Sequence, residues 1–142
     1  MSSNFNAGAI VYAKDIERLS QFYAQVAGLE IVHQVDDHVV LESDAYELVV
    51  VAIPAATAAR IVITTPPARR ENTAFKLVLP VRSLAEARAA AAAAGGALNA
   101  PEREWEFQGA RVCDGHDPEG NVVQFREAGA VDEVGDVGAV GE

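Results

Sequence analysis

A strand that follows a tight acidic turn carries two polar side chains on one face. Turn and strand together read HDPEGNVVQFRE, His116 to Glu127. Pro118 presets its own backbone angle and Gly120 tolerates a positive φ, so the start of this stretch is typical of a turn. Because alternate residues of a strand share a face, Gln124 and Arg126 lie side by side. An amide beside a guanidinium can hydrogen-bond a small polar ligand, so this strand is the first candidate for a binding site.

Histidine and cysteine, the other residues that often carry chemistry, are not arranged for it. His33 and His38 flank an Asp-Asp turn and His116 adjoins a different turn, so the sequence predicts no shared three-histidine metal site. Cys113 lies in an alternating strand without an identifiable base beside it, and a nucleophilic cysteine needs one. We therefore assign Cys113 to packing.

Composition excludes several classes of function. The chain has 142 residues, 21 Asp and Glu against 11 scattered Lys and Arg, and a formal charge of −10. A nucleic-acid-binding protein needs a clustered basic face, so this class is excluded, and the acidic charge favours a cationic ligand. No apolar run is long enough to cross a membrane, and the single cysteine rules out an intramolecular disulfide. We expect a cytoplasmic protein.

The pattern of elements occurs twice along the chain. In the first unit an apolar strand at 9–13 leads to Asp15 as a helix N-cap, a helix that ends at Gly28, and strands at 29–35, 38–42 and 46–53. In the second unit a strand at 75–81 leads to Ser83, with Glu86 at the spacing of a capping box, and an alanine-rich helix to about residue 94. Extended segments follow at 97–100, 103–107, 110–114 and 121–127.

These repeats predict one α+β domain over residues 1–128. We place module one at about 7–54, a proline-containing linker at about 55–72 and module two at about 73–128, followed by a flexible acidic tail at 129–142. Within the linker, RIVIT (residues 60–64) has the composition of a short strand.

The tandem βαβββ pattern, the helix entry AKDIERLSQFYAQVAGLEIV and the closing DPEGNVVQFRE resemble the vicinal oxygen chelate superfamily. This superfamily contains glyoxalases, bleomycin-resistance proteins and extradiol dioxygenases. The resemblance implies two open, curled mixed sheets that form a cup, with the modules paired within one chain or across a dimer. It also implies a homodimer.

The resemblance further implies where a metal would be held, with one ligand near the start of each module's first strand and one on each fourth strand. These positions fall at Gly8, Glu47, Lys76 and Gln124. Gly8 has no side chain and a protonated Lys76 cannot chelate, so two of the four ligands are missing. We therefore expect no resident metal and no other cofactor, and an ion pair between Lys76 and Glu47.

Two aromatic residues complete the set of predicted ligand contacts. Tyr12 has the same strand parity as Gly8, so it should also face the cup. The resemblance places Trp105 near the mouth of the cup, where its indole could stack on a planar ligand or close the edge of the core. The predicted ligand-binding residues are Tyr12, Glu47, Lys76, Trp105, Gln124 and Arg126.

Three functions remain open at this stage. The leading one is a protein of the bleomycin-resistance type, which sequesters a small cationic or aromatic molecule without chemistry. The alternative is a divalent-metal-dependent lyase, isomerase or dioxygenase that uses Glu47 and Gln124 as ligands. A module that only dimerises and regulates another protein is the third.

Overall fold

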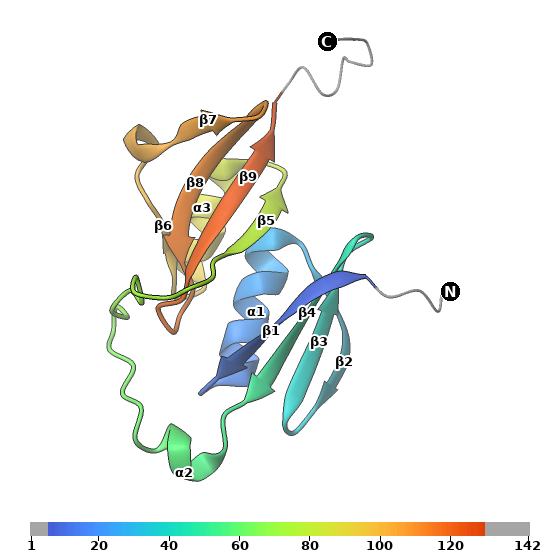
Figure 1. Ribbon diagram of the computed structural model, residues 1–142, viewed down its shortest axis with the longest axis vertical. Coiled ribbons are helices and arrows are strands. Elements are labelled where there is room, and N and C mark those ends of the chain that lie inside the picture. Colours follow the sequence, from blue (N-terminus) through green and yellow to red (C-terminus); the bar gives the residue numbers. More distant parts are fainter. Residues whose placement is uncertain (1–5, 130–142) are drawn as a thin grey trace.

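The computed structural model describes residues 6–129, which form two similar modules joined by a long linker (Figure 1). Module one contains β1 (Ala7–Ala13), α1 (Ile16–Ala27), β2 (Glu30–Val35), β3 (His38–Glu42) and β4 (Tyr46–Ala52). Module two contains β5 (Leu77–Val81), α3 (Leu84–Ala93), β6 (Ala97–Leu98), β7 (Trp105–Phe107), β8 (Ala110–His116) and β9 (Val122–Ala128). The short helix α2 (Ala55–Ala58) lies in the linker, and the 3₁₀ turn η1 (Pro101–Arg103) lies between β6 and β7.

The two sheets have the same topology. Module one has the strand order β1-β4-β3-β2 and module two has β5-β9-β8-β6. In each module the first strand pairs in parallel with the last, and the other pairings are antiparallel. Strand β7 is an addition that pairs with the first residues of β8, whereas β6 pairs with its last two. The predicted α+β fold of two tandem modules with open mixed sheets is confirmed.

The predicted helix caps position both helices. Asp15 accepts a hydrogen bond from the Arg18 backbone at 3.1 Å, and Gly28 ends α1 in the left-handed region at φ +72°. Ser83 accepts from the Glu86 backbone at 3.1 Å, but the Glu86 carboxylate accepts from Arg82 and does not complete a capping box. Each module therefore starts its helix at an equivalent cap.

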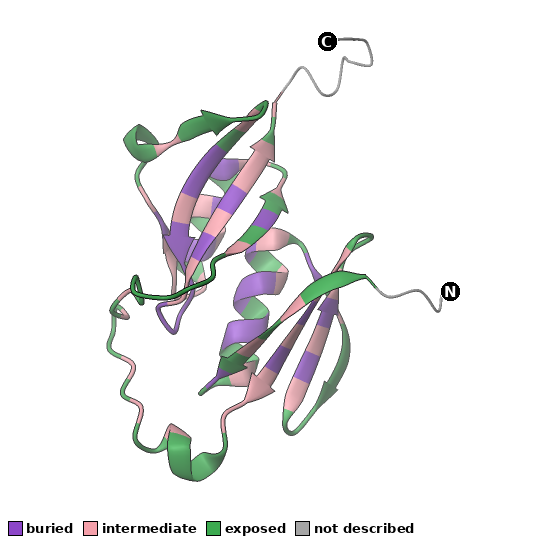
Figure 2. Ribbon diagram, viewed as in Figure 1, coloured by how far each residue is buried: buried purple, intermediate pink, exposed green. Residues whose placement is uncertain are grey.

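Both helices pack on the inner side of the sheets and leave the other sides open. Alternate strand residues are buried against the helices (Figure 2). The core includes Leu19, Phe22, Tyr23, Val39, Leu41, Leu48, Val50, Leu79, Val123 and Phe125. The opposite side of each sheet, called the open face below, carries Gly8, Ile10, Tyr12, Val40, Glu47, Val49 and Val51 in module one. In module two it carries Val78, Val112, Asp114, Val122, Gln124 and Arg126.

The linker differs from the expectation at one point. Residues 60–64 are not part of a strand, and the linker instead contributes an isolated bridge between Arg70 and Asn121. The Arg70 backbone also donates to the carbonyl of Gly120 at 2.8 Å. These bonds hold the second half of the linker against module two. The expected tail, residues 129–142, lies outside the described residues except for Gly129.

The acidic turn between β8 and β9 joins the modules. Buried Asp117 accepts a hydrogen bond from the Tyr23 hydroxyl of α1 at 2.6 Å. Glu119 accepts from the backbone N–H groups of Lys14 and Asp15 at 2.9 and 2.7 Å. The turn therefore does more than lead into a strand, because its two carboxylates bind the start and the middle of the first module's helix region.

Ionisation in this junction reflects its burial. Burial, followed by the charge of Asp117, raises the pKa of Tyr23 well above its usual range. Burial also raises the pKa of Asp117, while hydrogen bonds from Tyr23 and Asn121 lower it. The Asp117 oxygens receive four donors, two from Asn121 and one each from Tyr23 and the Glu119 backbone. These donors favour the ionised carboxylate and partly offset burial, which has the larger effect, so the pKa of Asp117 stays above its usual value.

Candidate functional site

Polar side chains form a row along the open face of module two. Lys76 donates to Asp114 at 2.9 Å, and Asp114 lies directly across the sheet from Gln124. Gln124 in turn accepts a hydrogen bond from Arg126 at 2.8 Å. The Arg126 guanidinium lies 4.9 Å from the ring centre of Phe107, within cation–π range. The sequence-predicted neighbours Gln124 and Arg126 thus belong to a continuous polar row.

Asp114 is the member of this row that sequence reasoning missed. One of its oxygens bonds Lys76, whereas the other, Oδ1, is buried without a hydrogen-bond partner among the described residues. A signal was present in the sequence, because pairing two strands symmetrically about the 117–121 turn places Asp114 opposite Gln124. An unpaired buried acceptor is costly, so this atom is suited to a donor from a ligand.

The predicted ion pair between Lys76 and Glu47 is wrong within this chain. Lys76 pairs with Asp114 of its own sheet, because β8 is close enough to offer a carboxylate. Glu47 lies in module one, beside Gly8.

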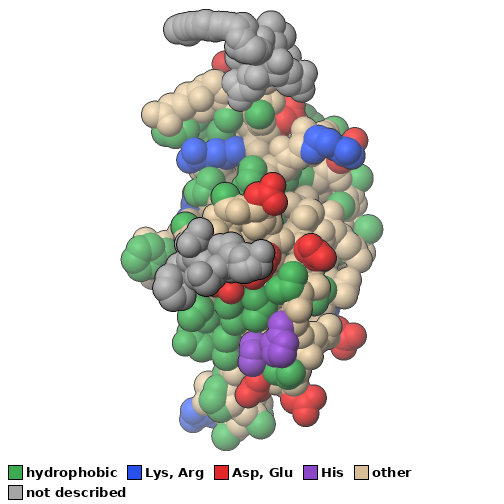
Figure 3. All heavy atoms as spheres, turned by 90° about the vertical axis from the view of Figure 1, so that its right-hand side faces the viewer, with side chains coloured by type: hydrophobic (Ala, Val, Ile, Leu, Met, Phe, Trp, Pro, Cys, Tyr) green, Lys and Arg blue, Asp and Glu red, His purple; other side chains and the backbone are tan. Residues whose placement is uncertain are grey.

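Tyr12 and Glu47 share the open face of module one but lie apart on it. Tyr12 is opposite Val51, four residues along β4 from Glu47, which corresponds to about 13 Å at strand spacing. Tyr12 is 63% exposed. Figure 3 shows this side of the molecule, where hydrophobic side chains gather over the sheet and histidines lie at their edge.

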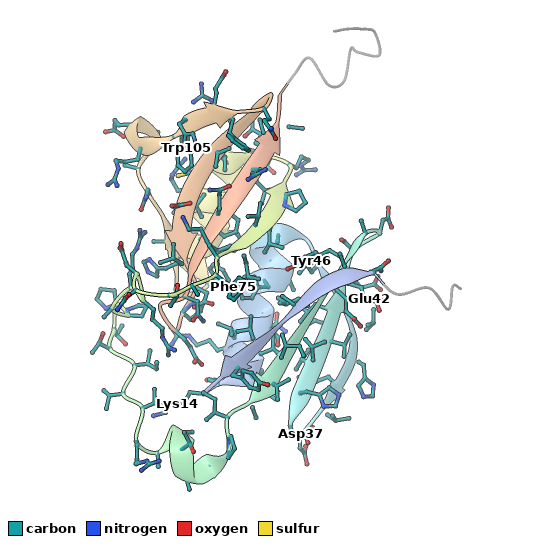
Figure 4. All side chains as sticks on the ribbon, viewed as in Figure 1. Lys14, Asp37, Glu42, Tyr46, Phe75 and Trp105 are labelled. Atoms are coloured by element: carbon teal, nitrogen blue, oxygen red, sulfur yellow. The ribbon has the colours of Figure 1, made fainter. Side chains whose placement is uncertain are left out.

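Two adjoining cavities lie beside the second half of the linker: the polar one is lined by the linker and module two, and the apolar one also by β1 of module one. One, of about 300 Å³, is polar, and its lining includes Arg69, Arg70, Lys76, Asn99, Arg103 and Asp114. The other, of about 310 Å³, is mostly apolar, and its lining includes Ile10, Tyr12, Leu77 and Asn121. Arg70, Thr73, Phe75 and Val122 line both. Phe75 lies in the space between the modules (Figure 4).

The linker supplies much of this lining, which no motif in the sequence indicated. Arg69, Arg70, Thr73 and Phe75 come from a segment that has neither helix nor strand periodicity. Their position depends on the bridge between Arg70 and Asn121, a contact between residues far apart in the chain. Sequence patterns report local periodicity, so they could not place this segment.

His116 is held neutral beside the polar cavity. Its Nδ1 atom accepts a hydrogen bond from Nε of Arg69 at 2.9 Å. Burial, and then the charge of Arg69, lowers the pKa of His116. A neutral His116 keeps Arg69 in place at the wall of the cavity.

Trp105 lies on β7, away from Phe75 (Figure 4), but Arg103, two residues before it, lines the polar cavity. Trp105 pairs with Val112 across the sheet and is 39% exposed. Its neighbour Phe107 is in contact with Arg126, so the aromatic strand continues the polar row. A ligand contact by Trp105 stays a prediction.

The donor set does not fit a divalent metal. Gly8 and Lys76 stand at two of the four positions that the resemblance implies, and Lys76 is engaged with Asp114. No group of three or more His, Cys, Asp or Glu side chains gathers at metal-binding distance within residues 6–129. His33 and His38 approach each other across the β2–β3 turn, with ring centres 5.4 Å apart, but His116 is elsewhere, in module two.

Two further hollows lie between the helices and are weaker candidates for a ligand site. One of about 450 Å³ lies between the end of α1 and the start of α3, where exposed Arg82 and Glu86 already pair with each other. The other, of about 540 Å³, is lined by exposed α1 residues and the alanines that end α3. Neither brings an unpaired buried polar group to its wall among the described residues.

Comparison with known proteins identifies the family. The glyoxalase-like domain family matches residues 9–125. The chain belongs to this family. The superfamily resemblance seen in the sequence is thereby confirmed. A comparison with curated proteins found no match.

Solved structures show the same fold as this glyoxalase-like domain. A glyoxalase/bleomycin resistance protein/dioxygenase family enzyme from Burkholderia phytofirmans PsJN is 21% identical, with a TM-score of 0.63 over 86% of this chain and 97% of that one. A glyoxalase/bleomycin resistance protein from Albidiferax ferrireducens T118 is 18% identical, with a TM-score of 0.59 over 85% and 96%. A bleomycin resistance determinant encoded on the transposon Tn5 is 18% identical, with a TM-score of 0.56 over 88% and 98%. At these identities the likeness concerns the fold alone.

Among the helices between residues 6 and 129, none combines the length and the apolar character that a membrane crossing requires.

Proposed function

We propose that this glyoxalase-like domain binds a small organic molecule on its open side without a resident metal. The observation that carries the proposal is the pair of adjoining cavities around Phe75, one polar and one apolar. Small-molecule sites combine apolar walls with a few convergent polar groups, and this pair has both. The solved structure of a bleomycin resistance determinant with the same fold is in line with drug sequestration.

The predicted site residues lie at different distances from the two cavities. Tyr12 lines the apolar cavity and Lys76 the polar one, so both contact the ligand directly. Gln124 and Arg126 extend the polar row from Asp114, and Trp105 lies level with Arg126, because both are paired with Val112. Glu47 lies at the far end of the first sheet. A ligand larger than the two cavities reaches Gln124 and Arg126 first.

A homodimer is part of the proposal. The open face of module one exposes 60% of Ile10 and 63% of Tyr12, and Val35 of β2 is 41% exposed. Contiguous apolar surface of this kind is costly in water and favours a second copy as cover. We place the protein in the cytoplasm, where its lone thiol, Cys113, stays reduced.

Metal dependence is tested by elemental analysis combined with ligand titration in a chelator. We expect no stoichiometric Zn²⁺, Ni²⁺, Mn²⁺ or Fe²⁺ in the purified protein and unchanged ligand affinity in EDTA. The metal-dependent lyase, isomerase or dioxygenase would instead be supported if the purified protein held stoichiometric metal, and if Gln124→Ala or Glu47→Gln lost both this metal and an enzymatic activity of the unmodified protein.

A further inference from the structure

The polar cavity has a local charge opposite to that of the whole protein. The chain carries a formal charge of −10, yet four cationic side chains and two acidic ones line this cavity. The cations are Arg69, Arg70, Lys76 and Arg103, and the acids are Glu71 and Asp114. A charge acts most strongly on what lies within a Debye length, about 8–10 Å in physiological salt. A ligand inside the cavity therefore experiences the cations more than the acidic surface.

Two of these cations are free to bind a ligand. Lys76 is engaged with Asp114, and Arg69 donates to His116. Within residues 6–129, no side-chain hydrogen bond or ion pair engages the guanidinium of Arg70 or of Arg103. Arginine presents a planar fork of donors that matches a carboxylate, so these two can hold an acid group.

Asp114, which lines the same cavity, has an acceptor that lacks a donor in the described part of the chain. Oδ1 of Asp114 is buried without a partner in the described part of the chain, although Oδ2 bonds Lys76. A ligand hydroxyl or amine that displaces the side chains covering Oδ1 would remove this deficit. A ligand with an acid group alone would leave it.

The adjoining cavity determines the rest of the ligand. Tyr12, Ile10 and Leu77 give it an apolar wall, and it shares Phe75 and Val122 with the polar cavity. Phe75 is 92% exposed, which leaves a large aromatic surface for contact. An apolar or aromatic group attached to the acid would lie against these side chains.

We infer that the ligand is a small organic acid with a hydroxyl or amine close to its acid group and an apolar body. Arg70 and Arg103 hold the acid group, Asp114 accepts from the hydroxyl or amine, and Tyr12 and Phe75 contact the apolar body. This inference rests on the proposed function and names its ligand class. It departs from the cationic ligand that the net charge favoured, because local charge outweighs distant charge.

The direct test is a calorimetric titration of the full chain with both enantiomers of 3-phenyllactate, which has all three features. Three probes each lack one: 3-phenylpropanoate lacks the hydroxyl, lactate lacks the phenyl group, and 3-phenyllactamide lacks the negative charge. We expect one enantiomer of 3-phenyllactate to bind, and each omission to weaken binding by about tenfold or more. Binding of the neutral amide that equals or exceeds binding of the acid would overturn the inference, as would no binding of either enantiomer.

Variants assign the effect to residues. Arg70→Gln and Arg103→Gln should each weaken the binding of 3-phenyllactate by about tenfold. Arg82 is an exposed arginine outside the cavity, so Arg82→Gln removes the same charge and should leave the affinity unchanged. Asp114→Ala should abolish the preference for 3-phenyllactate over 3-phenylpropanoate without reducing the affinity for 3-phenylpropanoate. Equal losses in Arg82→Gln and Arg70→Gln, or a preference retained in Asp114→Ala, would contradict the assignment.

The outcomes also separate this inference from the proposed function. If neutral or cationic molecules bind at the cavities and organic acids do not, the inference fails and the proposed function stands. If no small organic molecule of any charge binds there, both fail.

Discussion

The hydroxyl of Tyr23 donates to the carboxylate of Asp117 at 2.6 Å, across 94 positions of the chain and in the buried interior. Tyr23 belongs to α1 of module one and Asp117 to the turn before β9 of module two. Glu119 of the same turn accepts hydrogen bonds from the backbone N–H groups of Lys14 and Asp15. The geometry of the open side between the modules therefore depends on this junction.

Tyr23→Phe should lower the free energy of unfolding by about 1.5–3 kcal/mol, the usual range for a hydrogen bond to a charged group. The ring is retained, so packing with Phe22 changes little. Urea unfolding of both proteins measures the difference. Tyr12→Phe removes a hydroxyl from a side chain that is 63% exposed and should cost little. Equal effects of the two substitutions would mean that the Tyr23 bond is unimportant.

Gly120→Ala should destabilise the protein more than Gly28→Ala. Both glycines have a positive φ, which costs an alanine about 1–2 kcal/mol. At Gly28 a Cβ would meet nothing within 4 Å, whereas at Gly120 it would lie 2.1 Å from the carbonyl oxygen of Ala68. Gly120→Ala must also push the linker away from the turn. Thermal unfolding that shows the same loss for both variants would argue against this close approach.

Stability should fall as the pH drops below about 6.5, in part because of His116. Its pKa is lowered in the folded protein, by burial first and by Arg69 second. As the pH falls through the ordinary value of 6.5, the unfolded chain takes up this proton and the folded chain does not. His116→Gln keeps an acceptor for Arg69 and should show a weaker loss of stability in this window. His33→Gln removes an exposed histidine and is the control. A pH profile of His116→Gln identical to that of the unmodified protein would exclude this contribution.

Trp105 is the single tryptophan of the chain and offers a direct optical signal. If a ligand extends along the polar row to Arg126, its binding should change the fluorescence of Trp105. Trp105→Ala should then weaken the affinity by about 1–3 kcal/mol, the scale of a buried aromatic contact. Unchanged affinity in a fluorescence-independent assay such as calorimetry would assign Trp105 to the edge of the core.

The fold was readable from the sequence because its signals are local. Asp15 and Ser83 mark equivalent helix starts, Gly28 ends α1, and the alternation around Gln124 and Arg126 gives the face of β9 correctly. Each of these depends on residues within one helix turn or one strand.

The candidate site was only partly readable because its main contacts are long-range. The pairing of Lys76 with Asp114 depends on which strands are neighbours in the sheet, and family position suggested Glu47 instead. The linker residues Arg70 and Phe75 reach the cavities through a bridge to Asn121, just before β9, that has no sequence signature. The acidic turn was recognised, but its bond to Tyr23 joins two modules and could not be found by periodicity.

The central claim, that a small organic molecule binds at the two cavities around Phe75 without metal, is tested most directly by NMR. The measurement is a small-molecule fragment screen on ¹⁵N-labelled full chain in EDTA, with the backbone amides assigned. The account predicts that the fragments that bind shift amides at residues 10–12, 69–77 and 121–124 in a saturable way. Fragments that bind only elsewhere, or that bind at these residues only after a divalent metal is added, would contradict it.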